Sequence, residues 1–65
     1  MTLYTTANCP RCKMLKMKLA TKNIEYNEVS DIEVLLSKGI KQAPMLEVNG
    51  ELLNLSKAND YINSL

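Results

Sequence analysis

Two cysteines separated by two residues constrain this chain more than any other feature of its sequence. Cys9 and Cys12 are its only cysteines, and a bridge between them would close a loop too short to stabilise the fold much through chain entropy. Pro10, which lies between them, fits the first turn of a helix, where a missing backbone N–H costs nothing. The motif therefore predicts a helix that begins at the cysteines, and it indicates redox or metal chemistry rather than a structural cross-link.

Size and composition favour one small folded domain, which we assign to residues 1–65. A chain of this length buries only roughly 60% of the surface that its unfolded form exposes, but 46% of its residues are hydrophobic. No apolar run approaches the roughly 20 residues that span a bilayer, and the first residues lack the features of a signal peptide. We therefore expect a cytoplasmic monomer with no membrane or nucleic-acid partner. In such a reducing compartment, paired thiols catalyse reactions or bind metal.

Basic residues are concentrated in the part of the chain that begins at the first cysteine. The net charge is only +1, yet residues 9–22 contain five basic side chains and no acidic one, whereas residues 23–65 contain three lysines and seven carboxylates. The basic segment could steer an anionic partner, or it could be the solvated face of a helix. The sequence leaves both interpretations open.

The pattern of apolar residues predicts a strand, the helix at the cysteines and then a second strand. Residues 2–6 alternate and favour a strand, as do residues 24–29. The helix between them should run from residue 10 to about residue 22. Its buried face is predicted to contain Cys12, Leu15, Leu19 and Ala20. Met14 and Met17 lie on the opposite side, and we expect them to pack beneath another helix rather than form an exposed contact surface.

A capping box predicts where the second helix begins. Ser30 is a favourable N-cap residue, and Glu33, three residues later, is placed to bond back to the Ser30 backbone N–H. Gly39 is a usual residue just past the end of a helix. One face of the predicted helix carries Ile32, Leu35 and Leu36.

A hairpin and a third helix complete the predicted fold. Asn49-Gly50 is a strong turn signal between two strands, residues 45–48 and 51–53. Ser56 is a candidate cap for a last helix, whose apolar residues at helical spacing are Ala58, Tyr61, Ile62 and Leu65. The first two strands are joined through a helix and must be parallel, whereas the last two form an antiparallel hairpin. The sequence thus predicts an α/β fold of order β-α-β-α-β-β-α, with a mixed four-stranded sheet and helices on its faces.

The start of a helix is a favourable place for a reactive thiol. Unpaired backbone N–H groups and the positive end of the helix dipole favour a thiolate at Cys9, and Arg11 and Lys13 add positive charge. We expect the Cys9 thiolate to attack a disulfide and the more buried Cys12 to resolve the mixed disulfide. The chain contains no histidine, which excludes a Cys–His hydrolase and a self-contained zinc site with the usual set of protein ligands.

The sequence resembles the glutaredoxins and, among them, the NrdH-type redoxins that supply electrons to ribonucleotide reductase. The resemblance is carried by residues 3–12, residues 23–26 and residues 38–46, and it weakens after Glu51. It implies a thioredoxin-like fold of the glutaredoxin type, with Cys9 and Cys12 as the catalytic pair and a cis peptide bond between Ala43 and Pro44. The substrate-binding residues that it implies are Pro10, Arg11, Gln42, Ala43 and Pro44. The backbone of the residue before the proline would pair with an extended substrate.

The residues that hold glutathione in many glutaredoxins are largely missing from this chain. Thr5 and Thr6 stand where those proteins have a lysine, and residues 53–57 lack their glycine pair and aspartate. The chain also lacks the aromatic-rich tail of NrdH redoxins. The resemblance therefore implies no bound cofactor but a redox-active disulfide. Its electrons would come from NADPH through a thioredoxin reductase-like flavoprotein, or from glutathione, and pass to a protein disulfide such as that of ribonucleotide reductase.

Soft-metal binding is the main alternative to a redox function. Small metal-binding domains also place two thiolates between a first strand and a first helix and use them for Cu(I). Pro10 between the cysteines, the absence of a methionine two residues before Cys9, and the helical pattern at the end of the chain all count against it. Sharing of an iron–sulfur cluster between two copies is a third possibility, but it would need bound glutathione. We favour the dithiol electron carrier.

Overall fold

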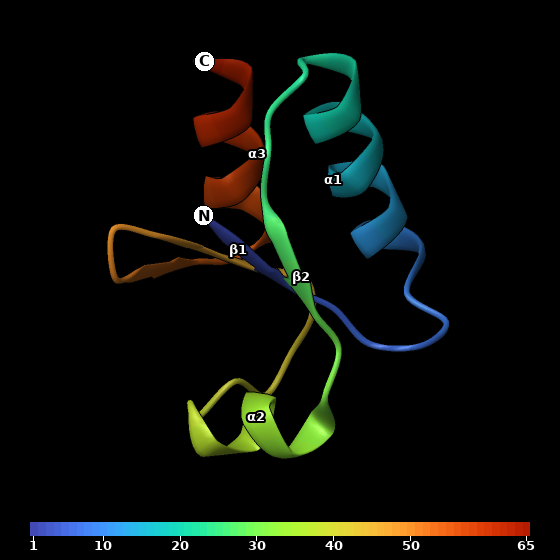
Figure 1. Ribbon diagram of the computed structural model, residues 1–65, viewed down its shortest axis with the longest axis vertical. Helices are drawn as coiled ribbons and strands as arrows, with labels where there is room; N and C mark the ends of the chain where they lie inside the picture. The colour runs from blue at the N-terminus through green and yellow to red at the C-terminus, as the bar shows by residue number, and fades with distance from the viewer.

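The strands and helices follow one another in the predicted order (Figure 1). The computed structural model describes all residues, 1–65. The elements are β1 (Thr2–Tyr4), α1 (Pro10–Thr21), β2 (Asn27–Val29), α2 (Ile32–Ser37), β3 (Met45–Val48), β4 (Glu51–Leu53) and α3 (Leu55–Asn63). None of the helices is long and apolar enough to cross a bilayer.

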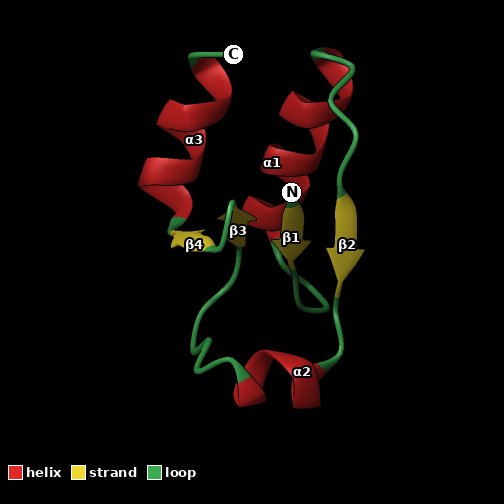
Figure 2. Cartoon of the chain, turned by 60° about the vertical axis from the view of Figure 1, so that its left-hand side comes forward, coloured by secondary structure: helices red, strands yellow, loops and turns green.

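The strands form one mixed sheet in the order β2-β1-β3-β4. β1 is parallel to β2 and antiparallel to β3, and β3 pairs with β4 as an antiparallel hairpin. Asn49 and Gly50 both have positive φ angles, 52° and 83°, as a tight hairpin turn of this type requires. α1 and α3 lie on one side of the sheet and α2 lies on the other (Figure 2). The predicted α/β architecture is confirmed.

The central strand β1 is buried on both faces and divides the core in two. The larger cluster lies under α1 and α3 and consists of Leu3, Leu15, Leu19, Leu46, Ala58 and Ile62. The smaller cluster lies under α2 and consists of Tyr4, Leu35 and Ile40. Because successive side chains of a strand point to opposite faces, Leu3 and Tyr4 contribute to different clusters. β1 therefore connects the two halves of the core and leads directly to the cysteine loop.

The first two strands are shorter than predicted. β2 begins at Asn27, which pairs with Thr2 at the start of β1, so residues 24–26 have no strand residue beside them to pair with. Ile24 instead donates its backbone N–H to the Leu19 carbonyl, which closes the turn after α1. At its other end, β1 stops at Tyr4 because the chain then turns toward the cysteines.

Both predicted serine caps are wrong. The N-cap of α2 is Asp31, whose carboxylate accepts the Glu33 backbone N–H at 2.9 Å, and the N-cap of α3 is Asn54, whose side-chain oxygen accepts the Lys57 N–H at 2.9 Å. Asp and Asn cap helices as well as Ser does. Because β4 ends at Leu53, the chain turns into α3 at the very next residue, before Ser56.

Several apolar side chains are more exposed than predicted. Met14 and Met17 are 53% and 70% exposed, so the prediction that they pack beneath another helix is wrong. Ala20 is also exposed, and only Leu35 of the predicted face of α2 is buried. The other large hydrophobic residues that are exposed are Ile32, Leu36 and Leu65. The reason is that each helix contacts the sheet through one narrow stripe, and no further layer covers its outer side.

Candidate active site

The loop between β1 and α1 places the first cysteine at the end of a helix. Asn8 has a positive φ of 57°, a conformation that asparagine tolerates better than most residues. Cys9 follows in an extended conformation as the N-cap of α1, and Pro10 is the first helical residue. The sequence prediction of a helix that starts at the cysteines is confirmed.

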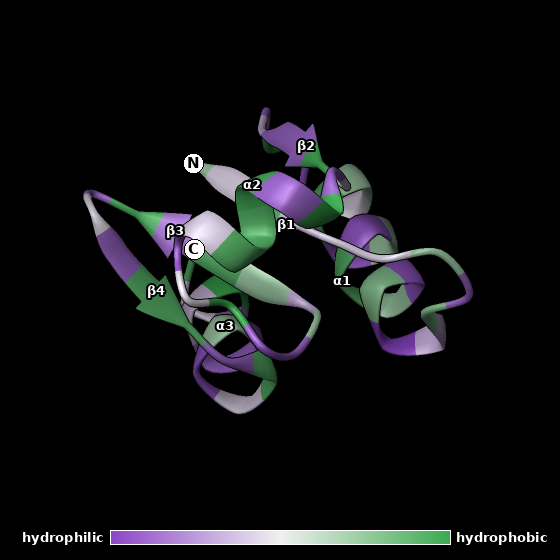
Figure 3. Cartoon of the chain, turned by 90° about the horizontal axis from the view of Figure 1, so that it is seen from below, coloured by the Kyte–Doolittle hydropathy of each residue, from purple (hydrophilic) through white to green (hydrophobic).

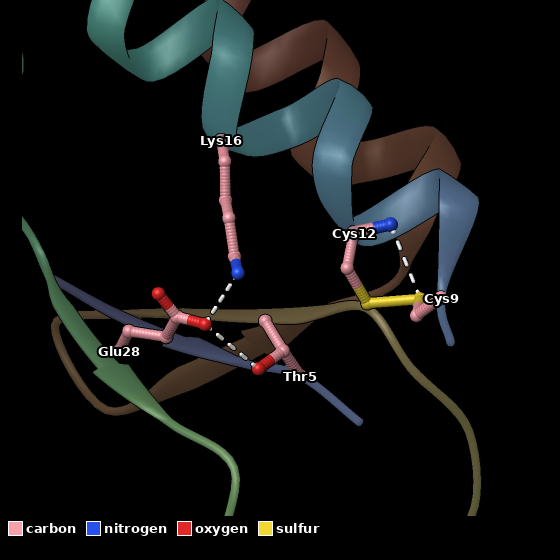
Figure 4. Close-up of a disulfide and its surroundings, with 5 residues drawn as sticks. All are labelled: Thr5, Cys9, Cys12, Lys16 and Glu28. Atoms are coloured by element: carbon pink, nitrogen blue, oxygen red, sulfur yellow. Dashed lines mark hydrogen bonds and ion pairs between the residues drawn. A yellow bond between two sulfur atoms is a disulfide. The ribbon is translucent and has the colours of Figure 1, made fainter. Parts of the chain in front are cut away.

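The two cysteines form a disulfide, and the two residues differ in exposure. Their Cα atoms are 5.2 Å apart, and the Cys12 backbone N–H donates to Cys9 Sγ at 3.1 Å (Figure 4). Cys12 is only 2% exposed, whereas Cys9 is partly exposed at the surface. An incoming group can therefore reach Cys9 more easily than Cys12, and an N–H group already points at the Cys9 sulfur.

A cis-proline lies next to the cysteine loop. The Ala43–Pro44 peptide bond is cis, as the family resemblance implies, and Pro44 is buried. Tyr4 pairs with Met45 in antiparallel register, so Pro44 lies at the level of Thr5, where β1 leads into the loop. The two segments are far apart in the chain, and the pairing of β1 with β3 brings them together.

Two neighbouring hollows flank this junction and share one residue. Thr6 lines a hollow of about 360 Å³ together with Cys9 and Cys12, and it also lines a hollow of about 290 Å³ together with Gln42 and Ala43. Four of the predicted site residues, Cys9, Cys12, Gln42 and Ala43, therefore line two adjoining hollows. Pro10 and Arg11 are exposed on the first turn of α1. Their contact with a substrate stays a prediction.

An ion pair beside the disulfide was not foreseen from the sequence. Glu28 on β2 accepts from Lys16 of α1 at 2.5 Å and from the Thr5 hydroxyl at 3.1 Å (Figure 4). The hydrogen bond from Lys16 is the largest influence on Glu28 and lowers its pKa below the usual value. Desolvation is the next largest and opposes this shift, and the Thr5 hydroxyl adds a smaller lowering effect. A sequence signal existed, because Lys16 is four residues after Cys12 and therefore lies on the same face of α1.

The available metal ligands are few. No group of three or more Cys, Asp or Glu side chains converges in a way that could hold a metal ion. Of the side chains of this type, only Cys9, Cys12 and Glu28 line the hollow at the disulfide.

A mixed four-stranded sheet with a Cys-x-x-Cys pair at the start of its first helix and a cis-proline before the third strand defines a protein of the thioredoxin-like class. The family model for glutaredoxin matches residues 1–53, and the chain therefore belongs to the glutaredoxin family of thiol–disulfide oxidoreductases. The match includes both cysteines and the cis-proline and ends with β4, so α3 lies outside it. No curated protein and no solved structure matches the chain.

Proposed function

We propose that the protein is a dithiol electron carrier that reduces disulfide bonds in protein substrates. The observation that carries the proposal is the unequal exposure of two cysteines at the start of α1, where Cys9 is accessible and Cys12 is 2% exposed. In the proposed reaction, the accessible cysteine meets the partner and the buried cysteine completes the reaction inside the protein. A carrier of this kind needs no bound cofactor.

The proposed reaction uses both cysteines in turn. The Cys9 thiolate attacks one sulfur of the substrate disulfide, so a mixed disulfide forms and the other substrate sulfur leaves as a thiolate. Cys12 then loses its proton and attacks Cys9 Sγ, and the second substrate sulfur leaves. The substrate has gained two electrons, solvent protonates its two sulfurs, and the carrier is left with the Cys9–Cys12 disulfide seen here.

The backbone around the cis-proline supports binding of an extended substrate. Neither the N–H nor the C=O of Ala43 takes part in a hydrogen bond within the chain, although Ala43 is half-buried. Free backbone groups beside a sheet can bind a peptide as an added strand. We propose that Gln42, Ala43 and Pro44 bind the substrate in this way, while Pro10 and Arg11 contact it from the first turn of α1.

The electron source and the substrate are further parts of the proposal. Electrons would come from NADPH through a thioredoxin reductase-like flavoprotein, or from glutathione, and would pass to a disulfide such as that of ribonucleotide reductase. The reaction would take place in the cytoplasm, where thiols are kept reduced. Because most glutathione-holding residues are missing, we propose that turnover depends on Cys12 rather than on glutathione as the resolving thiol.

Two parallel assays test this function. The oxidised protein is incubated with NADPH and thioredoxin reductase, or with NADPH, glutathione and glutathione reductase, and consumption of NADPH is followed with a disulfide protein as the final acceptor. We expect turnover in at least one assay, none with Cys9→Ser, and accumulation of the mixed disulfide with Cys12→Ser. Absence of turnover in both assays, together with tight Cu(I) binding by the reduced protein, would favour the metal-binding alternative.

A further inference from the structure

The Lys16–Glu28 pair lies in the same hollow as the disulfide, yet the proposed reaction does not use it. The hollow is lined by the loop of residues 5–9, by Cys12, Lys13 and Lys16 of α1, and by Glu28 and Ser30. Figure 4 shows Lys16 and Cys12 projecting from α1 toward the same side, where they face Glu28 and Thr5. The charged groups and the sulfurs therefore share one environment.

Glu28 is an exposed residue of the edge strand β2, but its side chain points toward α1. Glu28 is in register with Leu3, and residues paired in this way on adjacent strands point to the same face of the sheet. Leu3 belongs to the core beneath α1, so Glu28 also points toward α1 from a strand that is mostly hydrophilic (Figure 3). Two partners hold the carboxylate there, Lys16 and the hydroxyl of Thr5, which is itself 2% exposed.

The other charged groups around the cysteines are cationic. Arg11, Lys13 and Lys16 belong to α1, and Lys41 lines the adjacent hollow beside Thr6. Glu28 is the one carboxylate that lines the hollow of the disulfide. The next acidic residue along the chain, Asp31, is occupied as the N-cap of α2, and Tyr4 points into the core on the other face of the sheet.

We propose that the negative charge of Glu28 keeps the Cys9–Cys12 pair reducing, because it offsets the positive charge of α1. Reduction of the disulfide takes up two electrons and, when Cys9 stays ionised, one proton, which goes to Cys12. The product carries a negative charge that the disulfide lacks. Cations stabilise this product and make the pair a stronger oxidant, whereas a carboxylate opposes it and makes the pair a better electron donor.

This inference rests on the proposed function only for the direction of electron flow, because an electron donor needs a reducing pair. It assigns Lys16 and Glu28 opposite influences on the sulfurs although they form one ion pair. A purely structural role of the ion pair predicts shifts in the same direction for both substitutions, because loss of either partner breaks the same contact. The two roles can therefore be separated with two substitutions.

The test compares Glu28→Gln with Lys16→Gln in the full chain. The equilibrium between dithiol and disulfide is measured in a dithiothreitol redox buffer, and the ionisation of Cys9 is followed by the pH dependence of its alkylation. We expect Glu28→Gln to shift the equilibrium constant toward the dithiol by about two- to fivefold and to increase the thiolate fraction. A threefold change corresponds to about 14 mV. Lys16→Gln should shift both quantities in the opposite direction.

Two further variants serve as controls. Thr5→Val removes a hydrogen bond to Glu28 without changing the charge, and Glu51→Gln makes the same charge change as Glu28→Gln at an exposed site on β4. We expect both to leave the equilibrium nearly unchanged, and we expect the opposite shifts of the two main variants to shrink at high salt. Glu28→Gln is nearly isosteric and can still accept from Thr5, so this variant should fold.

The outcomes separate this inference from the proposed function, because the measurements concern the cysteines alone and need no substrate. Opposite shifts support the inference even if neither reductase assay shows turnover. Shifts in the same direction, or no shift with Glu28→Gln, would overturn it even if turnover is efficient.

Discussion

The two faces of the sheet are covered very unequally. On one face, α1 and α3 contribute 12 and 9 residues, and six residues are fully packed between them and the sheet. On the other face, α2 has 6 residues and a cluster of three buried residues. The cysteines lie on the face that α1 and α3 cover, whereas the cis-proline follows α2, the short helix that covers the other face. The predicted nucleophile is thus held on the better anchored half of the molecule.

Polar contacts strengthen the same asymmetry. Lys18 of α1 donates to the side-chain oxygens of Asn59 and Asn63 of α3, and Lys22 donates to the main-chain oxygens of Asn63 and Leu65. Three of the five basic residues of this segment, these two and Lys16, therefore bind groups within the chain. The basic segment has a structural role that neither sequence interpretation anticipated.

The largest expected effect is on the core beneath α1. Leu19→Ala should destabilise the protein by about 3–5 kcal/mol, because Leu19 is fully buried and its truncation leaves a cavity. A single core of this size rarely supplies more than about 3–5 kcal/mol in total, so the variant should be largely unfolded. Urea denaturation followed by circular dichroism measures this directly. A fully folded Leu19→Ala variant would contradict the importance given to this face.

Truncation on the opposite face should cost less. Leu35 is 4% exposed and packs within the smaller cluster, so we expect Leu35→Ala to lose about 2 kcal/mol and to leave a folded population. The same denaturation experiment compares the two variants. If Leu35→Ala were as damaging as Leu19→Ala, the two faces would be equivalent and the comparison would fail.

The caps of the helices provide a smaller, well-controlled test. Asn54→Ala should destabilise the protein by about 1 kcal/mol, because the Lys57 N–H loses its partner. Ser56→Ala is the matched control, since this serine lies inside the first turn of α3 and should be nearly neutral. Thermal unfolding of both variants distinguishes them. A larger loss of stability with Ser56→Ala than with Asn54→Ala would support Ser56 as the N-cap, as the sequence alone suggests.

The smallest expected effects are on the pH dependence of stability, and they differ in sign between the faces. The pKa of Glu28 is lowered, first of all by Lys16. The contribution of Glu28 to folding stability is therefore present above the ordinary value of 4.5 and is lost as the pH falls through the lower folded pKa. On the α2 face, Tyr4 and then Glu47 raise the pKa of Lys38 above 10.5. That contribution is present below pH 10.5 and is lost as the pH rises through the higher folded pKa.

Substitution separates these two contributions. Glu28→Gln should flatten the acid limb of the stability curve and Lys38→Gln the alkaline limb, each only slightly because the side chains are partly exposed. Denaturation midpoints measured from acid to alkaline pH check both. A change on the acid limb with Lys38→Gln would contradict the assignment.

Much of the fold was predictable because it depends on local patterns. The cysteine motif with Pro10 indicates the start of α1, and Asn49-Gly50 indicates the hairpin, because these signals act through backbone geometry within a few residues. The order of elements then requires a mixed sheet. The cis-proline was predicted only through the family resemblance, since an isolated X–Pro bond does not reveal its isomer.

The sequence by itself thus determined the order of the elements and the position of the cysteine pair at a helix start. Tertiary structure alone decided which side chains surround that pair. Glu28 reaches Lys16 because β2 lies beside β1 in a register that turns it toward α1, and Ala43 nears the cysteine loop because β3 pairs with β1. The physical reason is that local signals act through neighbouring backbone atoms, whereas these contacts join residues that meet only when the sheet is assembled.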